Sequence, residues 1–288
     1  MSLLIKFSAY KKNKMKNNFR VGILGGGFVG SAVAFGFGSS NGHQFDIKVH
    51  DIDSTKSTHS FNQMAAESDF IFVCLPTPQS TDGAIDLKYI EEGVYSLSKV
   101  VDPFNQTIII KSTVIPGTCR RLSQKYGINI VSNPEFLTER RAKWDFINAA
   151  QVVIGSDEKD SAAKVKSLYE KRFSSQKYVI TDSITSEFIK YMLNCFFSTK
   201  ISFMNEMFQI GSNFGADWDS AVAGFVGDSR VADSHVTVPG PDGSLGFGGH
   251  CFPKDLNAMI KFGERLGVDA KVMKAAWGKN IEVRKDTL

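Results

Sequence analysis

The 288-residue chain has few cysteines, and none of them is spaced as a metal site or a disulfide framework requires. The four are Cys74, Cys119, Cys195 and Cys251, with no C-x-x-C pair among them. This scatter argues against zinc binding and structural disulfides, and it is typical of proteins from a reducing compartment. We therefore expect no metal in the functional site.

Long apolar runs are also missing. No segment approaches the 18 consecutive apolar residues that a membrane-spanning helix requires. The apolar stretch Leu3-Leu4-Ile5 is too short for the central region of a signal peptide. These two absences predict a soluble cytoplasmic protein that has no contact with a membrane.

Acidic residues are absent from the first 20 positions, which carry six basic ones: Lys6, Lys11, Lys12, Lys14, Lys16 and Arg20. Residues 1–19 are therefore predicted to be a basic tail. Because the net charge of the whole chain is only +4, the remainder is close to neutral. That balance argues against a nucleic-acid surface and is compatible with an anionic ligand.

Residues 20–51 carry a dinucleotide-binding pattern. A buried strand at 20–24 leads into Gly25-Gly26-Gly27-Phe28-Val29-Gly30, which fits G-x-G-x-x-G, and then into a small-residue helix. In this motif the first glycine makes the turn, the second admits the pyrophosphate, and the third lets helix and strand pack closely. Asp51 ends the next strand, where a carboxylate binds ribose hydroxyls and disfavours NADP; Asp53 is a competing candidate. We predict NAD as the cofactor, with contacts from Gly25, Gly27, Phe28, Val29, Gly30 and Asp51.

Further strands near 69–75, 107–111, 128–131 and 151–155 alternate with helices. This alternation predicts an α/β Rossmann-type domain over residues 20–182, with a doubly wound, mostly parallel sheet. The strand ends carry Thr77, Thr113 and Glu135, which we expect to line one crevice with the dinucleotide. For Thr77, ordinary turn chemistry is an equally good explanation.

Glu135 and Glu139 lie four positions apart. If this segment is helical, both carboxylates share one face and could orient or activate water. The alternative is a surface helix in which these acids pair with the basic residues at 140, 141 and 143.

Residues 183–288 are predicted to form an all-helical central domain. Its first helix, from about Ser183 to Phe214, has an apolar stripe interrupted by Lys190 and Asn194, and unpaired polar groups are costly to bury. These two side chains could donate hydrogen bonds to an oxyanion, or they could serve interhelical packing. Arg230, after the next helix, is a candidate phosphate or carboxylate ligand, or simply a helix-end charge.

The stretch 246–255 places Cys251 behind three glycines and ahead of Pro253, which can open a helix with Lys254 and Asp255 in its first turn. Such a setting can present a thiol and tune its reactivity. Cys251 is therefore a candidate nucleophile, and a small buried apolar residue is the alternative.

Taken together, these motifs resemble the UDP-glucose 6-dehydrogenase family, whose relatives include GDP-mannose and UDP-N-acetylmannosamine dehydrogenases. The resemblance spans about residues 20–285. Besides the glycine motif, it rests on Ser112-Thr113-Val114-Ile115-Pro116-Gly117-Thr118, Asn133-Pro134-Glu135-Phe136-Leu137, Lys190-x-x-x-Asn194, the stretch 200–206, and Gly246-Phe247-Gly248-Gly249-x-Cys251-Phe252-Pro253-Lys254-Asp255.

The resemblance implies an NAD-dependent four-electron oxidation of a C6 alcohol, UDP-glucose to UDP-glucuronate, through a thiohemiacetal and a thioester on the cysteine. It implies catalytic roles for Cys251, Lys190, Asn194, Asp255, Thr113 and Glu139. It implies substrate contacts for Glu135, Phe136, Leu137, Arg230 and Gly248. It implies further cofactor contacts for Thr77, Pro78, Ser112, Thr113 and Lys254. It also implies a homodimer through the long helix, with Arg230 reaching across the subunit interface.

Two departures from the family pattern leave the identity of the sugar substrate open. Family members continue into a third domain that holds much of the nucleotide, so we expect a short form without the C-terminal UDP-binding domain. The link at 239–245 is longer than usual, and His250 stands where serine is common in the glucose enzymes. The alternatives are a dehydrogenase for GDP-mannose or UDP-N-acetylmannosamine, and a weakly active NAD-binding dimerisation module.

Overall fold

The structure is a computed structural model, which describes residues 19–38 and 45–284. Within these ranges one seven-stranded sheet has the order β2-β1-β3-β4-β5-β6-β7. The strands are β1 Arg20–Leu24, β2 Asp46–His50, β3 Phe70–Val73, β4 Thr107–Ile110, β5 Ile130–Ser132, β6 Gln151–Gly155 and β7 Lys177–Thr181. Neighbouring strands are parallel except β5 and β6, which are antiparallel. The prediction of a mostly parallel α/β sheet is therefore confirmed.

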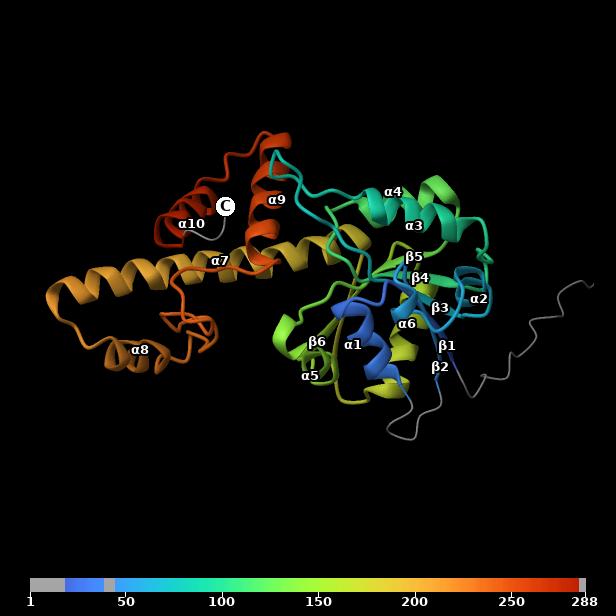
Figure 1. Cartoon of the computed structure of the whole chain (residues 1–288), viewed down its shortest axis with the longest axis horizontal. Helices are drawn as coiled ribbons and strands as arrows, with labels where there is room; N and C mark the ends of the chain where they lie inside the picture. The colour runs from blue at the N-terminus through green and yellow to red at the C-terminus, as the bar shows by residue number, and fades with distance from the viewer. Residues whose placement is uncertain (1–18, 39–44, 285–288) are drawn as a thin grey trace, which may run out of the picture.

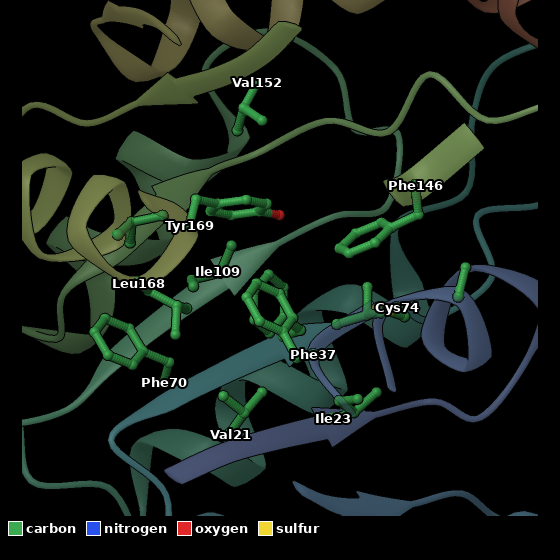
Figure 2. Packing of buried hydrophobic residues seen from close by; sticks show 14 of the residues in the cluster. Val21, Ile23, Phe37, Phe70, Cys74, Ile109, Phe146, Val152, Leu168 and Tyr169 are labelled. Carbon is green, nitrogen blue, oxygen red and sulfur yellow. The ribbon is translucent and has the colours of Figure 1, made fainter. Parts of the chain in front are cut away.

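Helices pack on both faces of this sheet, because its central strands are apolar on both sides. They are α1 Phe28–Phe37, α2 Phe61–Ala66, α3 Lys88–Ser98, α4 Thr118–Tyr126, α5 Ala142–Ile147 and α6 Lys159–Arg172, with short 3-10 turns η2 Ser54–Lys56 and η3 Glu139–Arg141. In β3, Phe70 and Phe72 belong to one core cluster and Ile71 and Val73 to the other, as strand alternation requires. Figure 2 shows the first cluster, in which Phe37 lies among Phe70, Phe146 and Tyr169.

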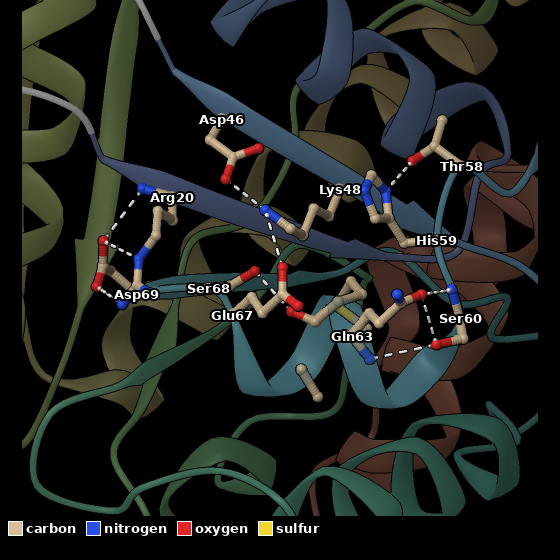
Figure 3. A network of polar contacts seen from close by, with 12 residues as sticks. Arg20, Asp46, Lys48, Thr58, His59, Ser60, Gln63, Glu67, Ser68 and Asp69 are labelled. Atoms are coloured by element: carbon tan, nitrogen blue, oxygen red, sulfur yellow. Dashed lines mark hydrogen bonds and ion pairs between the residues drawn. The ribbon is translucent and has the colours of Figure 1, made fainter.

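Polar contacts order the sheet edge near β1 and β2. Arg20 pairs with Asp69 at 2.6 Å, and the buried Lys48 ammonium pairs with Asp46 and Glu67 (Figure 3). Helix α2 was not predicted, although it has a capping box in which Ser60 and Gln63 bond reciprocally. The helix is only six residues long, so apolar periodicity could not reveal it.

A long helix, α7 Ser183–Phe214, leaves the sheet and supports the remaining helices (Figure 1). Its start is capped by the Asp182 carboxylate, which accepts a hydrogen bond from the Thr185 amide, and it ends at Gly215 with φ of +82°. The predicted limits of this helix are those observed. The helices that follow are α8 Trp218–Val226, α9 Phe252–Arg265 and α10 Lys271–Val283, and α9 and α10 pack against α7. No helix in the described residues is both long enough and apolar enough to cross a bilayer.

Candidate active site

The glycine motif forms a tight passage from β1 into α1. Gly25 has φ of +98°, which favours glycine. A Cβ built on Gly30 would lie 1.9 Å from the Gly25 carbonyl oxygen, so only glycine lets the helix approach the turn. A Cβ on Gly27 would meet nothing within 4 Å, which leaves open space at the N-terminus of α1. This cradle fits the pyrophosphate of a dinucleotide.

Asp51 follows β2 and faces this loop. Its carboxylate accepts hydrogen bonds from the Gly26 amide at 2.6 Å and the Asp53 amide at 2.8 Å. The Asp53 side chain is turned to η2, where it accepts bonds from the amide and hydroxyl of Thr55. The geometry therefore favours Asp51 over Asp53 as the carboxylate beside the cradle.

Other predicted cofactor residues lie at the carboxyl ends of β3 and β4, which are adjacent parallel strands. Thr77 and Thr113 are buried, Pro78 is exposed, and the Ser112 hydroxyl donates to the Leu75 carbonyl at 2.7 Å. The two strand ends are thus tied together on the side of the sheet where β1 meets the glycine turn.

Cys251 is the residue immediately before α9, and its side chain is partly exposed. Pro253 and Asp255 both lie in the first turn of α9, and Asp255 is fully buried. The Asp255 carboxylate accepts hydrogen bonds from the Asn194 amide at 2.6 Å and the Lys254 ammonium at 2.5 Å. The contact with Asn194 joins α9 to α7 within the first turn after the cysteine.

A second buried pair, Lys190 with Glu135, also acts on the thiol. The Lys190 ammonium on α7 is 3.1 Å from the Glu135 carboxylate, and both side chains are about 95% inaccessible, with exposed fractions of 4% and 5%. Glu135 also accepts a hydrogen bond from the Leu137 amide at 2.6 Å. Burial lowers the pKa of Lys190, but Glu135 and Asp255 reverse this, and the pKa is raised overall. Lys190 therefore keeps its charge although it is buried.

The thiol itself is neutral in this setting. Burial raises the pKa of Cys251, and the Glu135 and Asp255 carboxylates raise it further, whereas Lys190 and Lys254 oppose them. Both amino groups consequently favour the thiolate, so the balance of charges around the cysteine controls its reactivity.

A cavity of about 770 Å³ opens at these groups. Among the predicted residues, it is lined by Phe136, Leu137, Lys190, Asn194, Gly248 and Cys251. Glu135 and Asp255 do not line it, although their partners Lys190 and Asn194 do. Residues that the sequence analysis missed, including Lys111, Asn133, Phe197, His235 and Arg284, also line this cavity.

Among the residues predicted to take part in catalysis or to contact the substrate, Arg230 and Thr113 are also absent from the lining of this cavity. Arg230 has a side chain that is 86% exposed and pairs with Asp228 at 2.6 Å, so within one chain it does not contact the site. Thr113 remains at the end of β4. Glu139 begins η3, whereas residues 133–138 are not helical, so the shared helix face of Glu135 and Glu139 does not form.

Glu187 is a further buried acid whose partners the sequence did not indicate. From α7 its carboxylate accepts bonds from the amides of Gly117 at 2.5 Å and Cys119 at 2.7 Å, capping α4. Burial raises its pKa to about 7, and these hydrogen bonds oppose the rise. It joins the long helix to the segment that follows Ser112 and Thr113.

Comparison with known proteins extends this description. Residues 48–173 match the NAD binding domain of the UDP-glucose/GDP-mannose dehydrogenase family, and residues 184–282 match its central domain. UDP-glucose 6-dehydrogenase of Rickettsia conorii is 36% identical over 235 residues, which are 79% of this chain and 52% of that protein. The Bacillus subtilis enzyme of that name is 32% identical, over 75% of this chain and 49% of its own length. The chain thus spans about half the length of the curated relatives it matches.

Solved structures agree. A UDP-glucose dehydrogenase from Pyrobaculum islandicum superposes with a TM-score of 0.82 at 27% identity, covering 93% of this chain and 69% of that one. A 3-hydroxyisobutyrate dehydrogenase from Mycobacterium tuberculosis has a TM-score of 0.74 at 17% identity, covering 93% and 94% of the two chains. The latter likeness is one of fold alone. With an NAD-binding domain and a central domain in the same order, the chain belongs to the UDP-glucose/GDP-mannose dehydrogenase family.

Proposed function

We propose that the chain carries out the NAD-dependent, four-electron oxidation of the C6 alcohol of a nucleotide sugar, with UDP-glucose as substrate and UDP-glucuronate as product. The observation that carries this proposal is the pair of buried polar contacts, Lys190 with Glu135 and Asn194 with Asp255, whose donor residues line the same cavity as Cys251. Buried charges are costly and cluster at functional sites. The curated relatives named UDP-glucose 6-dehydrogenase support the choice of sugar.

NAD, held in the cradle at residues 25–30 and beside Asp51, would accept a hydride in each of two oxidations. The first oxidation removes a hydride and a proton from the alcohol and leaves an aldehyde. The Cys251 thiolate then forms a bond to the aldehyde carbon, and the carbonyl oxygen becomes an oxyanion that gains a proton. The second oxidation leaves a thioester, and water cleaves its carbon–sulfur bond to give the carboxylate and the thiol.

The oxyanion is the group that Lys190 and Asn194 are proposed to stabilise. Each is held by a carboxylate, so its donor is oriented before the substrate arrives. Asp255 is proposed to accept a proton from water or from the thiol, while Thr113 and Glu139 help to place water. Phe136, Leu137 and Gly248 are proposed to contact the sugar.

The test measures NADH formation by the purified chain with a panel of UDP- and GDP-sugars. Two NADH per UDP-glucose are expected, and Cys251→Ser should reduce turnover by roughly 1,000-fold or more. Cys119→Ser, the same exchange at a buried cysteine in α4, serves as the matched control and should retain activity. Tight NAD binding without turnover of any sugar would contradict an enzymatic role and favour an NAD-binding module. Turnover of GDP-mannose or UDP-N-acetylmannosamine in preference to UDP-glucose would reassign the sugar.

We also propose a homodimer through α7. Large apolar side chains with exposed fractions of 41% to 74% follow one another along this helix: Phe188, Met192, Phe196, Phe203, Met207, Ile210 and Phe214. Intervals of three, four and seven residues keep them on one side, and such apolar surfaces commonly mark interfaces. Light scattering should give the mass of a dimer, and Phe203→Asp should shift it toward the monomer. A wild-type chain that stays monomeric at high concentration would contradict the proposal.

A further inference from the structure

Lys111 is a buried lysine to which the chemistry above gives no role. It follows β4, and its side chain lines the cavity although the residue is only 5% exposed. Its ammonium lies 3.2 Å from the Asn133 side-chain oxygen, 3.5 Å from the Pro134 carbonyl and 5.6 Å from the centre of the Phe146 ring. Burying an ammonium costs several kcal/mol unless other groups stabilise it, so this placement needs a reason.

The main partner, Asn133, is held from several elements at once. Its amide nitrogen donates to the Val153 carbonyl of β6 at 2.7 Å, and its side-chain oxygen accepts from the Tyr169 hydroxyl of α6 at 2.6 Å. Its backbone amide bonds to Ile110 of β4 at 2.9 Å. Lys111 adds a charged donor to the same side-chain oxygen, so the end of β5 is fixed where the chain turns toward the site.

Two residues beyond Asn133 the chain reaches Glu135, which pairs with Lys190 beside the thiol. The charge of Lys111 also acts on this carboxylate. The titratable groups that face Lys111 are Cys74 after β3, Glu135 after β5 and Lys190 on α7. Glu135 therefore lies under the influence of two ammonium groups, one in the proposed oxyanion site and one behind it.

We propose that Lys111 is a positioning residue, which fixes the Glu135 segment through Asn133 and Pro134 and offsets the negative charge that Glu135 exerts on Cys251. The inference rests on the proposed dehydrogenase function. Without Lys111, the Glu135 carboxylate would be less well placed to orient Lys190. Lys190 alone would offset its negative charge, so more of that charge would disfavour both the thiolate and the oxyanion.

If Lys111 has this role, its ionisation should affect the pH dependence of kcat. Burial lowers the pKa of Lys111 to about 8, with Lys190 lowering it further and Cys74 and Glu135 opposing the fall. Below this pH the ammonium is charged, and above it the charge is lost. We therefore expect the wild-type kcat to fall on the alkaline side as Lys111 deprotonates.

The decisive variant is Lys111→Met in the full chain, because methionine is unbranched and uncharged. It should lower kcat by about tenfold or more, since small misplacements at a reacting centre have effects of that size. The KM for UDP-glucose and the dissociation constant of NAD should change much less, and the alkaline fall in kcat should disappear. A kcat and a pH profile equal to those of the wild type would overturn the inference.

Lys48→Met is the matched control, because Lys48 is equally buried, at 5% exposed, but pairs with Asp46 and Glu67 away from the cavity. This variant should keep the wild-type kcat and the alkaline limb of the pH profile, which is the fall in kcat at high pH, even if its stability is lower. If Lys48→Met loses the alkaline limb as Lys111→Met does, a general effect of removing a buried lysine explains the result and the inference fails.

Tyr169→Phe keeps the inference testable if Lys111→Met does not fold. It removes one donor to Asn133 and no charge, so kcat should fall by roughly threefold with the alkaline limb intact, as expected for a slightly looser site. A wild-type kcat in this variant would count against the inference. Inactivity of the wild-type chain itself would contradict the proposed function instead, so the two failures are distinguishable.

Discussion

Two regions of the molecule are proposed to serve the same reaction but are built in different ways. They are the cofactor cradle, residues 25–30 with Asp51, and the cysteine cluster, which is Cys251 with Glu135, Lys190, Asn194 and Asp255. In the cradle, three glycines and one carboxylate lie within 27 residues of each other, from Gly25 to Asp51, and the backbone provides most of the surface. In the cysteine cluster, Glu135, Lys190 and Asp255 come from three separated segments, and charged side chains provide the surface.

This difference determines which substitutions each region tolerates. In the cradle, substitutions are restricted by the available space, because a single methyl group at Gly30 would overlap backbone atoms. In the cysteine cluster, substitutions are restricted by charge, because each buried ion is tolerated only while its partner is present. Substitutions should therefore fail for steric reasons in the first region and for electrostatic reasons in the second.

The largest effect is expected from Lys190→Met. Glu135 would lose its charged partner, and the proposed oxyanion would lose a donor, so kcat should fall by about 1,000-fold. The unfolding free energy should fall by about 3–5 kcal/mol, as when one partner of a buried ion pair is removed. Steady-state kinetics and urea unfolding measure the two effects. Lys166→Met, at an exposed ion pair on α6, is the control and should change neither; a similar loss there would remove the contrast.

The next largest effect should separate two glycines of the cradle. Gly30→Ala should destabilise the fold by about 1–3 kcal/mol, because the methyl group is overpacked against the Gly25 carbonyl. Gly27→Ala should fold like the wild type yet bind NAD about tenfold more weakly, because its methyl group occupies the space left for the pyrophosphate. Thermal unfolding and NAD titration test the pair. Gly224→Ala, which also has open space around its Cβ, should leave NAD binding unchanged. Equal stability of the two cradle variants would argue against a steric limit.

A smaller effect concerns the pH dependence of Cys251 alkylation. Its pKa is raised by burial and by two carboxylates, so the thiolate fraction should be low at neutral pH and rise steadily above it. Iodoacetamide labelling followed by mass spectrometry should show a rate that increases with pH, ahead of Cys74 and Cys195, whose burial raises their pKa values to about 12. Glu135→Gln should lower the pKa of Cys251 and speed labelling at neutral pH. An unchanged labelling rate in Glu135→Gln would show that carboxylate charge does not control the thiol.

The patterns that were correctly predicted are local ones. The glycine motif, the apolar strands and the 32-residue helix α7 each depend on neighbours within a few positions. The limits of α7 agree with the structure, whereas the strand predicted near 69–75 is shorter, Phe70–Val73, and the one near 128–131 begins two residues later, at Ile130. Helix α2 was not predicted, because the capping box is its only sequence signal. The helical face shared by Glu135 and Glu139 did not form, because Asn133 and Pro134 keep the chain extended after β5.

By itself, the sequence determined that a dinucleotide cradle precedes Asp51 and that Cys251 stands before a proline-opened helix, because turns, caps and periodicity act over short distances. Only the tertiary structure decided which groups pair. Glu135 meets Lys190 across 55 positions and Asn194 meets Asp255 across 61, and Lys111 approaches Asn133 from the neighbouring strand. Such contacts arise because burial strongly favours charged and polar side chains that have a partner, and the partner within reach depends on how the sheet and helices pack.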